Sequence, residues 1–235
     1  MTDAIAAPAA TPLDYHDLPH LIGLMTGDEK HAVSADSTLD VLWVLYSRVL
    51  NVTPATADDP DRDRFLLSKG HGPMSYYAVL AARGFIPVDA LSTFGAFDSM
   101  LGHHPDRTLI RGVEISSGSL GHGLPIGVGV ALGLQAQARD GRVVVLVGDA
   151  ELDEGTNHEA IALAGRLGLE RLTVVAIDNR SATHGWPGAI AARFEVEGWA
   201  SATVDGRDHD ALETAFNAAP VGRPMVVVTV VEEGS

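Results

Sequence analysis

The sequence predicts an α/β protein with a doubly wound, mainly parallel sheet and helices on both faces. Three short runs, at 143–147, 173–178 and 225–231, are β-branched and continuous rather than alternating. Such runs are typical of parallel strands that are covered on both faces. Helical patterns at 156–167 and 208–219 separate them, and the alternation of strands and helices favours this fold class.

The remaining helices are predicted from apolar spacing and capping residues. The strongly apolar segment 37–50 is expected to be a helix that is either buried or at an interface, and 76–83 is a second helix. A third, at 124–138, is rich in Gly and Ala, which allows another backbone to approach closely. We expect 37–50 and 124–138 to be surfaces of association. Asp208 is the expected N-cap of the helix before the last strand.

The composition limits the class of protein. Of the 235 residues, 46% are apolar and 20% are charged, which excludes wholesale disorder. No apolar run reaches the roughly 18 residues of a transmembrane helix, and the lack of cysteine excludes disulfides and thiolate sites. The formal net charge of −15 disfavours binding to nucleic acid or to an anionic membrane. We expect a soluble cytoplasmic protein, with a flexible arm over 1–12 and a single domain over 13–235.

Polar residues follow two of the predicted strands. Asp149 comes after the strand at 143–147, and Asn179 comes after the strand at 173–178. In parallel sheets of this kind, ligands bind beyond the carboxyl ends of the strands. Carboxylate and amide oxygens suit Mg²⁺ or Ca²⁺, and Mg²⁺ usually keeps phosphate and water in its shell. The pair indicates a metal–diphosphate site, and the alternative is an Asp that caps a helix and an Asn in a turn.

Three glycine-rich turns carry histidines. His71 lies between two glycines in the segment 68–72, and His103 and His104 form a second turn. The third turn, 118–123, opens a predicted helix, where free amides can meet an anion. A single histidine is more often a surface or core residue with ordinary hydrogen-bond partners than a catalytic residue. Several histidine-containing turns in one cysteine-free acidic chain favour a functional site.

These motifs resemble the thiamine-diphosphate-binding N-terminal region of transketolases, and most closely the separate N-terminal subunit of two-chain transketolases. The first segment is DRFLLSKGHG at 63–72, and the second is GHHPDRTLIRGVEISSGSLGHG at 102–123. The third begins with GDAELDEG at 148 and ends with the Asp-Asn pair at 178–179. Three motifs in the right order make the resemblance specific, and it covers about 28 to about 230.

The resemblance implies that the chain binds thiamine diphosphate through a divalent metal. Asp149, the side-chain oxygen of Asn179 and the main-chain oxygen of Ser181 would hold Mg²⁺ (or Ca²⁺), which would bridge the two phosphates. Gly118 and Leu120 match positions that pack on the thiazolium and present backbone to the aminopyrimidine. The other implied cofactor-binding positions are His71, Gly148, Ala150 and Glu151.

The resemblance also implies four catalytic residues. His71 matches a histidine that contacts the diphosphate and approaches the substrate, and His104 matches one that polarises the hydroxyketone end of the substrate. Glu154 matches an acid that reaches across the subunit interface towards the glutamate that activates the cofactor. His31 aligns with the first catalytic histidine of the family. Ketose cleavage removes a proton from a hydroxyl group, and formation of the product requires that a proton is given back. Histidines that titrate near neutrality can carry out both transfers.

The sequence departs from the family pattern in four places. Ala150 replaces a glycine, and its Cβ requires a negative φ. His122 replaces a glutamine and is either a further proton carrier or a polar substitute. The segment around His31 lacks the family's glycines. After 231, no residue matches a further diphosphate-contacting histidine of the family.

We expect the chain to be one half of an enzyme. Its partner would be the C-terminal transketolase subunit, which carries the pyrimidine-binding domain. The pair would transfer a two-carbon ketol unit from a ketose (phosphate) to an aldehyde, with a homodimer for this chain alone and an α₂β₂ assembly with the partner. One alternative is the α-type subunit of a thiamine-dependent 2-oxoacid decarboxylase or dehydrogenase, against which the histidine turns at 68–72 and 102–105 argue. The other is a non-catalytic scaffold of the same fold.

Overall fold

The computed structural model describes residues 13–26, 29–182 and 185–231, and it describes side chains in the first long helix only from residue 36. The predicted arm over 1–12 therefore lies outside the described residues. The described chain forms one five-stranded sheet in which all neighbouring strands are parallel. The strand order is β1-β2-β3-β5-β4, with β1 at Arg64–Leu67, β2 at Val143–Gly148, β3 at Leu172–Asp178, β4 at Ala200–Asp205 and β5 at Met225–Val230.

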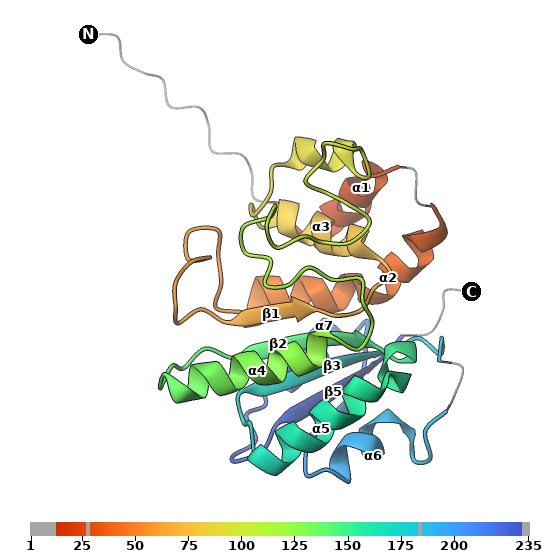
Figure 1. Cartoon of the computed structure of the whole chain (residues 1–235). Helices are drawn as coiled ribbons and strands as arrows, with labels where there is room; N and C mark the ends of the chain where they lie inside the picture. Colours follow the sequence, from red (N-terminus) through yellow and green to blue (C-terminus); the bar gives the residue numbers. More distant parts are fainter. Residues whose placement is uncertain (1–12, 27–28, 183–184, 232–235) are drawn as a thin grey trace.

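Helices cover both faces of this sheet, which confirms the predicted fold class. Figure 1 shows α1 to α3 on one side of the sheet and α4 to α6 on the other. Shorter turns of helix, at Tyr15–Asp17, Leu45–Val49, Val88–Thr93 and Ala150–Asp153, join the larger elements. The helices are α1 at Leu18–Gly23, α2 at Glu29–Val44, α3 at Pro73–Ala82, α4 at Gly123–Ala136, α5 at Gly155–Leu167, α6 at Ala189–Glu195 and α7 at His209–Phe216.

The central strands are buried on both faces because successive side chains enter two different cores. In β2, Val144 and Leu146 pack in the core that contains the residues of α2 and α3. Val143, Val145 and Val147 pack in the core formed with α4, α5 and α6. Strands with this double burial must be apolar at every position, which is why their continuous β-branched runs were recognisable in the sequence.

The segment 37–50 is buried within the chain itself. It forms the end of α2 and the following turn, and Val41, Leu42, Val44 and Leu45 are fully buried. Helices α3 and α7 pack against α2. The expectation of a buried helix is confirmed, but the segment is not a surface of association, because its apolar side chains are already covered.

The other predicted elements lie close to their expected positions. The Asp208 side chain accepts hydrogen bonds from the amides of Asp210 and Ala211, which confirms it as the N-cap of α7. Strand β4 and helix α6 were not predicted. Strand β4 lies at the sheet edge and is only partly buried, and α6 has seven residues. Among the described residues, no helix is both long and apolar enough to cross a membrane.

Because the strands are parallel, their carboxyl ends share one edge of the sheet. The loops that leave β1, β2 and β3 there begin at Ser68, Asp149 and Asn179. The register pairs Leu67 with Leu146 and Gly148 with Ile177, which brings these three exits together. This edge is where the sequence placed its candidate site.

Candidate functional site

Asp149 is the centre of the carboxyl edge. Its side chain is 2% exposed, and it accepts hydrogen bonds from the loop that follows β3. The donors there are the amides of Ser181 (2.8 Å) and Ala182 (3.1 Å) and the Ser181 hydroxyl (2.5 Å). The amide of Ala150 also donates to it, at 2.8 Å. One carboxylate therefore joins the ends of β2 and β3.

Asn179 has an unsatisfied oxygen beside this carboxylate. The residue is 9% exposed, and its Oδ1 has no hydrogen-bond partner among the described residues. A buried polar atom without a partner costs free energy, and such an atom calls for a ligand, water or ion. Arg180, with φ at 57°, turns the chain directly after it. The amide oxygen and the Asp149 carboxylate are both hard donors, so the residues present fit a divalent metal such as Mg²⁺.

Among the described residues, no group of three or more His, Cys, Asp or Glu side chains is placed to hold a metal. Mg²⁺ does not require such a group, because it usually takes one or two carboxylates from the protein and the rest of its ligands from phosphate and water. Ala150 also fits the site, because its φ is not positive and it begins the short helical turn after Asp149.

The glycine turn before α4 contacts the other loops of this edge. A Cβ on Gly118 would lie 2.9 Å from the ring atoms Cγ and Cδ2 of His104, so the imidazole lies directly against this glycine. Leu120 reaches to 3.2 Å from the Cβ position of Gly70. The carbonyl of Gly121 accepts a hydrogen bond from the Thr156 hydroxyl at 2.7 Å.

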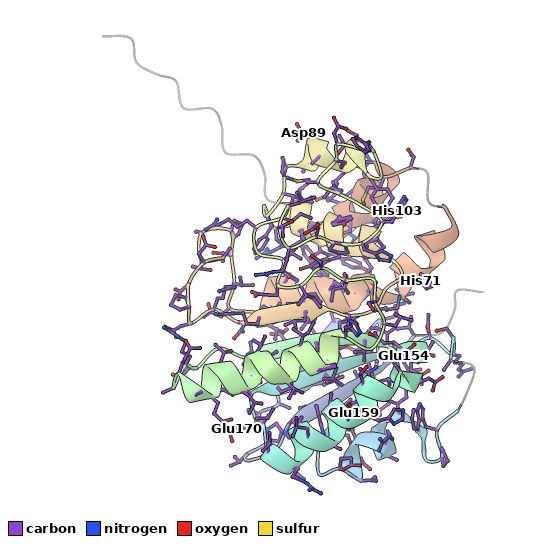
Figure 2. All side chains as sticks on the ribbon, viewed as in Figure 1. His71, Asp89, His103, Glu154, Glu159 and Glu170 are labelled. Atoms are coloured by element: carbon purple, nitrogen blue, oxygen red, sulfur yellow. The ribbon has the colours of Figure 1, made fainter. Side chains whose placement is uncertain are left out.

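This turn therefore gathers the predicted residues. Gly121, with φ at 79°, lies against Glu154, whose Cβ is 2.6 Å from the position of a Cβ on the glycine. Leu120 lies over the turn that holds His71, and both His71 and Glu154 are exposed. Figure 2 shows His71 and Glu154 along the same side of the molecule. His122 is the exposed residue that precedes α4.

The two neighbouring histidines of the second turn lie in different surroundings. The His103 ring packs edge-on against Phe94, with 5.4 Å between the ring centroids. The His104 ring lies on Gly118 of the glycine turn. The resemblance selected His104 rather than His103 as the catalytic residue, and that assignment stays a prediction. His31 lies in the first turns of α2, and its side chain is outside the part of the chain that the structure describes.

Glu151 has a role that the sequence did not indicate. It was assigned to the cofactor, but its side chain is 2% exposed and turned into the protein. It accepts hydrogen bonds from the Ser68 hydroxyl, from the amide of Gly121 at 3.0 Å and from the amide of Gly148 at 3.3 Å. Burial raises the pKa of Glu151, and these hydrogen bonds together with the charge of Lys69 oppose the shift. Glu151 thus ties three loops together.

Lys69 is the second residue that the sequence analysis missed. It is 7% exposed, and its ammonium donates to the carbonyl of His71 at 3.1 Å. Burial lowers the pKa of Lys69 to about 8, and the negative charges of Asp149 and Glu151 oppose that shift. Its position inside the SKGHG segment was the available signal. The burial of its side chain depends on tertiary structure, which no local pattern indicates.

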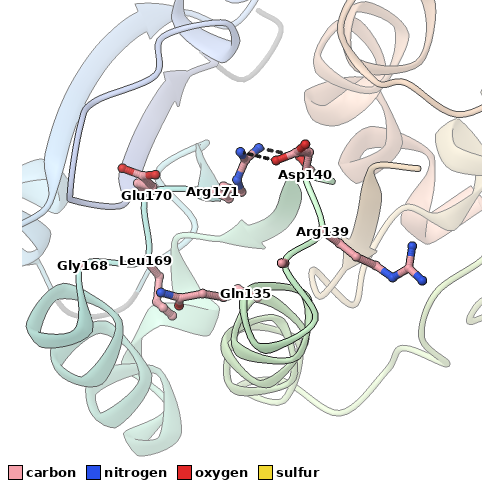
Figure 3. A pocket seen from close by; sticks show the side chains of 9 residues that line it. Gln135, Arg139, Asp140, Gly168, Leu169, Glu170 and Arg171 are labelled. Carbon is pink, nitrogen blue, oxygen red and sulfur yellow. Dashed lines mark hydrogen bonds and ion pairs between the residues drawn. The ribbon is translucent and has the colours of Figure 1, made fainter. Parts of the chain in front are cut away.

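A separate hollow lies at the opposite edge of the sheet. It has a volume of about 470 Å³ and lies between the end of α4 and the turn that precedes β3. Figure 3 shows Arg171 paired with Asp140 in its wall. Arg139 is likewise paired with Asp61. The remaining charged residue in this wall, Glu170, is exposed and accepts a hydrogen bond from the amide of Gly222 at 2.8 Å. The charged groups of this hollow therefore have partners within the protein.

The sequence profile of the transketolase thiamine-diphosphate-binding domain matches residues 27–235. A protein from Actinobacillus succinogenes, named as one subunit of an apulose-4-phosphate transketolase, is 35% identical over 206 residues, which are 85% of this chain and 75% of that protein. In the solved structures, a transketolase mutant from Pichia stipitis matches with a TM-score of 0.76 and 25% identity. That match covers 93% of this chain but only 36% of the yeast protein.

A further relative carries a different name. A protein from Rhodococcoides fascians named "Ferredoxin fas2" is 55% identical over 226 residues, which are 96% of this chain and 74% of that protein. Iron–sulfur clusters are held by cysteine thiolates, and this chain has no cysteine. The matched residues therefore cannot supply thiolate ligands for such a cluster, and the name of that relative does not describe this chain.

Proposed function

Because this chain belongs to the transketolase family, through its thiamine-diphosphate-binding N-terminal domain, we propose that it is the diphosphate-binding subunit of a two-chain ketol transferase. With Mg²⁺ and a partner subunit, it transfers a two-carbon ketol unit from a ketose or ketose phosphate to an aldehyde. The pair of Asp149 and Asn179 carries this proposal, since a buried carboxylate and an unsatisfied amide oxygen stand together at the carboxyl edge.

The metal is held by the Asp149 carboxylate, the Asn179 Oδ1 and the main-chain oxygen of Ser181. Hydrogen bonds from Ser181 and Ala182 already hold the Asp149 carboxylate at the end of β3. This positions it beside Asn179 before a ligand arrives. A bound metal would give the Asn179 Oδ1 the partner that it lacks, so metal binding should stabilise the folded chain.

Thiamine diphosphate, when bound, supplies the nucleophilic carbon and the electron sink. The chain's own residues position the substrate and move protons. His104, exposed and held against Gly118, would bind and polarise the hydroxyketone end of the substrate. His71 lies at the turn beside Leu120, where it would contact the diphosphate and approach the substrate. Histidines of this kind can take the proton from the hydroxyl next to the cleaved bond and return one when the product forms.

The second half of the site comes from another chain. The relative from Actinobacillus succinogenes is named as one subunit of its enzyme, and the yeast transketolase extends well beyond the matched region. Glu154 is exposed at the carboxyl edge and faces outward for such a partner. We propose a homodimer for the chain alone and an α₂β₂ assembly with the partner. Helix α4 is the candidate surface, because it carries no charged side chain and exposes Ile126 and Leu132 by 43% and 36%.

The test is reconstitution with a companion chain that carries the pyrimidine-binding domain. With thiamine diphosphate and Mg²⁺, the mixture should consume a ketose phosphate in the presence of an aldehyde acceptor, and each chain alone should be inactive. Light scattering of this chain and of the mixture measures the assembly states. Consumption of pyruvate with release of CO₂, and no use of ketoses, would support the 2-oxoacid alternative instead. A chain that binds neither metal nor cofactor in the presence of its partner would be a scaffold.

A further inference from the structure

Lys69 lies at the wall of the proposed diphosphate site. Its amide and that of Ser68 both donate to the carbonyl of Leu146, which fixes this stretch of backbone on β2. The side chain then crosses Gly148, with Cγ, Cδ and Cε at 3.4, 3.6 and 3.7 Å from the position of a Cβ on that glycine. Any ligand that approaches the backbone of Gly148 therefore meets the methylenes or the ammonium of Lys69.

The charges around Lys69 are negative. Asp149 and Glu151 both act on it electrostatically, and both are 2% exposed. In a buried site, such charges interact more strongly than in water. The lysine therefore partly offsets two buried carboxylates, and it lies where a metal-bound diphosphate would add further negative charge.

Lysine is a rare residue in this chain, so its presence at position 69 is informative. The chain has only two lysines, Lys30 and Lys69, and its other fourteen basic residues apart from histidine are arginines. An ammonium is a compact point charge on a flexible stem, whereas a guanidinium is a planar fork. The Lys69 side chain is 7% exposed and its ammonium donates to the carbonyl of His71, a buried position that suits the compact group.

We propose that Lys69 is a cofactor-binding residue that makes the metal site selective for a metal–diphosphate pair over the bare metal. The inference rests on the proposed function, because it assumes that Asp149 and Asn179 hold the metal. A fixed cation repels a bare dication, and it attracts a polyanion. Lys69 therefore weakens binding of metal alone and strengthens binding of diphosphate with metal, so that the two load together.

The experiment measures these two affinities separately in the full-length chain. Calorimetry with Mn²⁺ alone gives the metal affinity, and calorimetry with inorganic pyrophosphate at saturating Mn²⁺ gives the diphosphate affinity. In Lys69→Met, the pyrophosphate affinity should fall by roughly 10- to 100-fold, the effect of losing one charge-assisted hydrogen bond. The Mn²⁺ affinity should stay the same or rise.

The matched control is Arg142→Met. Arg142 pairs at 2.9 Å with Asp63, which is buried, and both precede their strands at the opposite edge of the sheet. This variant also removes a cation from a buried carboxylate, so its thermal stability should fall while its pyrophosphate affinity stays within about twofold of the wild type.

A second variant separates the proposal from a purely structural role. Glu151→Gln removes the charge that Lys69 offsets, so the double variant Lys69→Met with Glu151→Gln should fold even if Lys69→Met does not. If Lys69 serves the diphosphate, pyrophosphate affinity in the double variant should remain roughly 10- to 100-fold below that of the Glu151→Gln single variant. Recovery of that affinity, or an equal loss of Mn²⁺ and pyrophosphate binding in Lys69→Met, would overturn the inference. A wild-type chain that binds neither probe would overturn the proposed function as well.

Discussion

Three aspartates among the described residues are almost completely buried, and two of them, Asp40 and Asp149, have different kinds of hydrogen-bond partners. Asp40, on α2, is 4% exposed, and Asp149, after β2, is 2% exposed. The Asp40 carboxylate accepts hydrogen bonds from the Tyr15 hydroxyl (2.6 Å), from His209 (2.7 Å) and from the Arg207 guanidinium (2.7 Å). The hydrogen bonds to Asp149 come from backbone amides and a serine hydroxyl, none of which carries a charge.

The difference separates a structural cluster from a binding site. Around Asp40, charged and aromatic side chains from three parts of the chain satisfy the carboxylate and join α2 to α7. Around Asp149, the charge is held in place but not neutralised by those donors, and Asn179 beside it keeps a free oxygen. A buried charge that its own hydrogen bonds leave uncompensated is costly, and a cation would remove that cost.

The largest expected effect is loss of the metal site. We expect Asp149→Ala and Asn179→Ala each to reduce Mg²⁺-dependent binding of thiamine diphosphate by at least about 100-fold, since each removes one of few protein ligands. Both variants should still unfold cooperatively. Equilibrium binding, followed by the intrinsic fluorescence of Trp186 and the other tryptophans, measures the first effect, and urea unfolding measures the second.

Asp40→Asn is the matched control for these variants. It alters an equally buried aspartate whose partners Arg207 and His209 follow β4. Strand β5 separates β4 from β3, so Asp40 is remote from Asp149 along the sheet, and cofactor affinity should not change. If Asp149→Ala retained the wild-type affinity, or if Asp40→Asn lost it, the contrast between the two aspartates would fail.

The next effect concerns turnover. In the reconstituted enzyme, His104→Ala should lower kcat by roughly 100-fold, the usual size for a lost acid–base or polarising group. Cofactor affinity should change little, because His104 is placed toward substrate rather than diphosphate. His103→Ala is the control, since His103 packs against Phe94 and its loss should leave kcat within a few-fold of the wild type. Equal activity of the two variants would show that the geometry does not distinguish these histidines.

The sequence was sufficient for the central strands and for placing Asp149 and Asn179 after neighbouring strands at one edge of the sheet. Their role as metal ligands stays a prediction. Strands β2, β3 and β5 are buried on both faces, so their composition identifies them, and parallel strands then place their carboxyl ends together. The edge strand β4 was missed because it is partly exposed and lacks that composition. The short strand β1 was seen only as an apolar run.

The hydrogen bonds of the Glu151 side chain could not be predicted from the sequence, for a different reason. Its hydrogen bond with Ser68 joins residues 83 positions apart, and no local pattern indicates such a contact. Likewise, the apolar pattern of 37–50 could not show whether the chain itself or another subunit covers the helix. Both questions depend on how separate elements pack.

A smaller effect is expected in the stability of the Asp40 cluster. Asp40→Asn removes a charge that accepts three hydrogen bonds, so the free energy of unfolding should fall by about 2–3 kcal/mol at neutral pH. Chemical denaturation followed by circular dichroism measures it. A change below about 0.5 kcal/mol would mean that the cluster contributes little to holding α7 against α2.

The same cluster gives the fold a defined response to acid. Burial alone would raise the pKa of Asp40, but hydrogen bonds from Tyr15, Arg207 and His209 outweigh it and lower the pKa. A carboxyl whose pKa is lower in the folded state stabilises the fold above its ordinary value of 3.8, and this contribution is lost as the pH falls through the folded value. The wild type should therefore lose more stability than Asp40→Asn when both are titrated from about pH 5 to about pH 2. Parallel curves would contradict this assignment.

The smallest effect separates the glycines of the two regions. Gly121 belongs to the carboxyl edge, and its positive φ and its contact with Glu154 leave no room for a side chain. Gly129 lies within α4, and a Cβ there would meet nothing within 4 Å. Since glycine weakens a helix interior relative to alanine, Gly129→Ala should raise the free energy of unfolding by about 0.5–1 kcal/mol. It should leave cofactor affinity unchanged, whereas Gly121→Ala should weaken it. Denaturation of the isolated chain at concentrations too low for self-association, together with binding measurements on both variants, provides the test. A Gly129→Ala chain that is destabilised at these concentrations would contradict the prediction, whereas destabilisation only at concentrations where the proposed homodimer forms would place Gly129 in its contact surface.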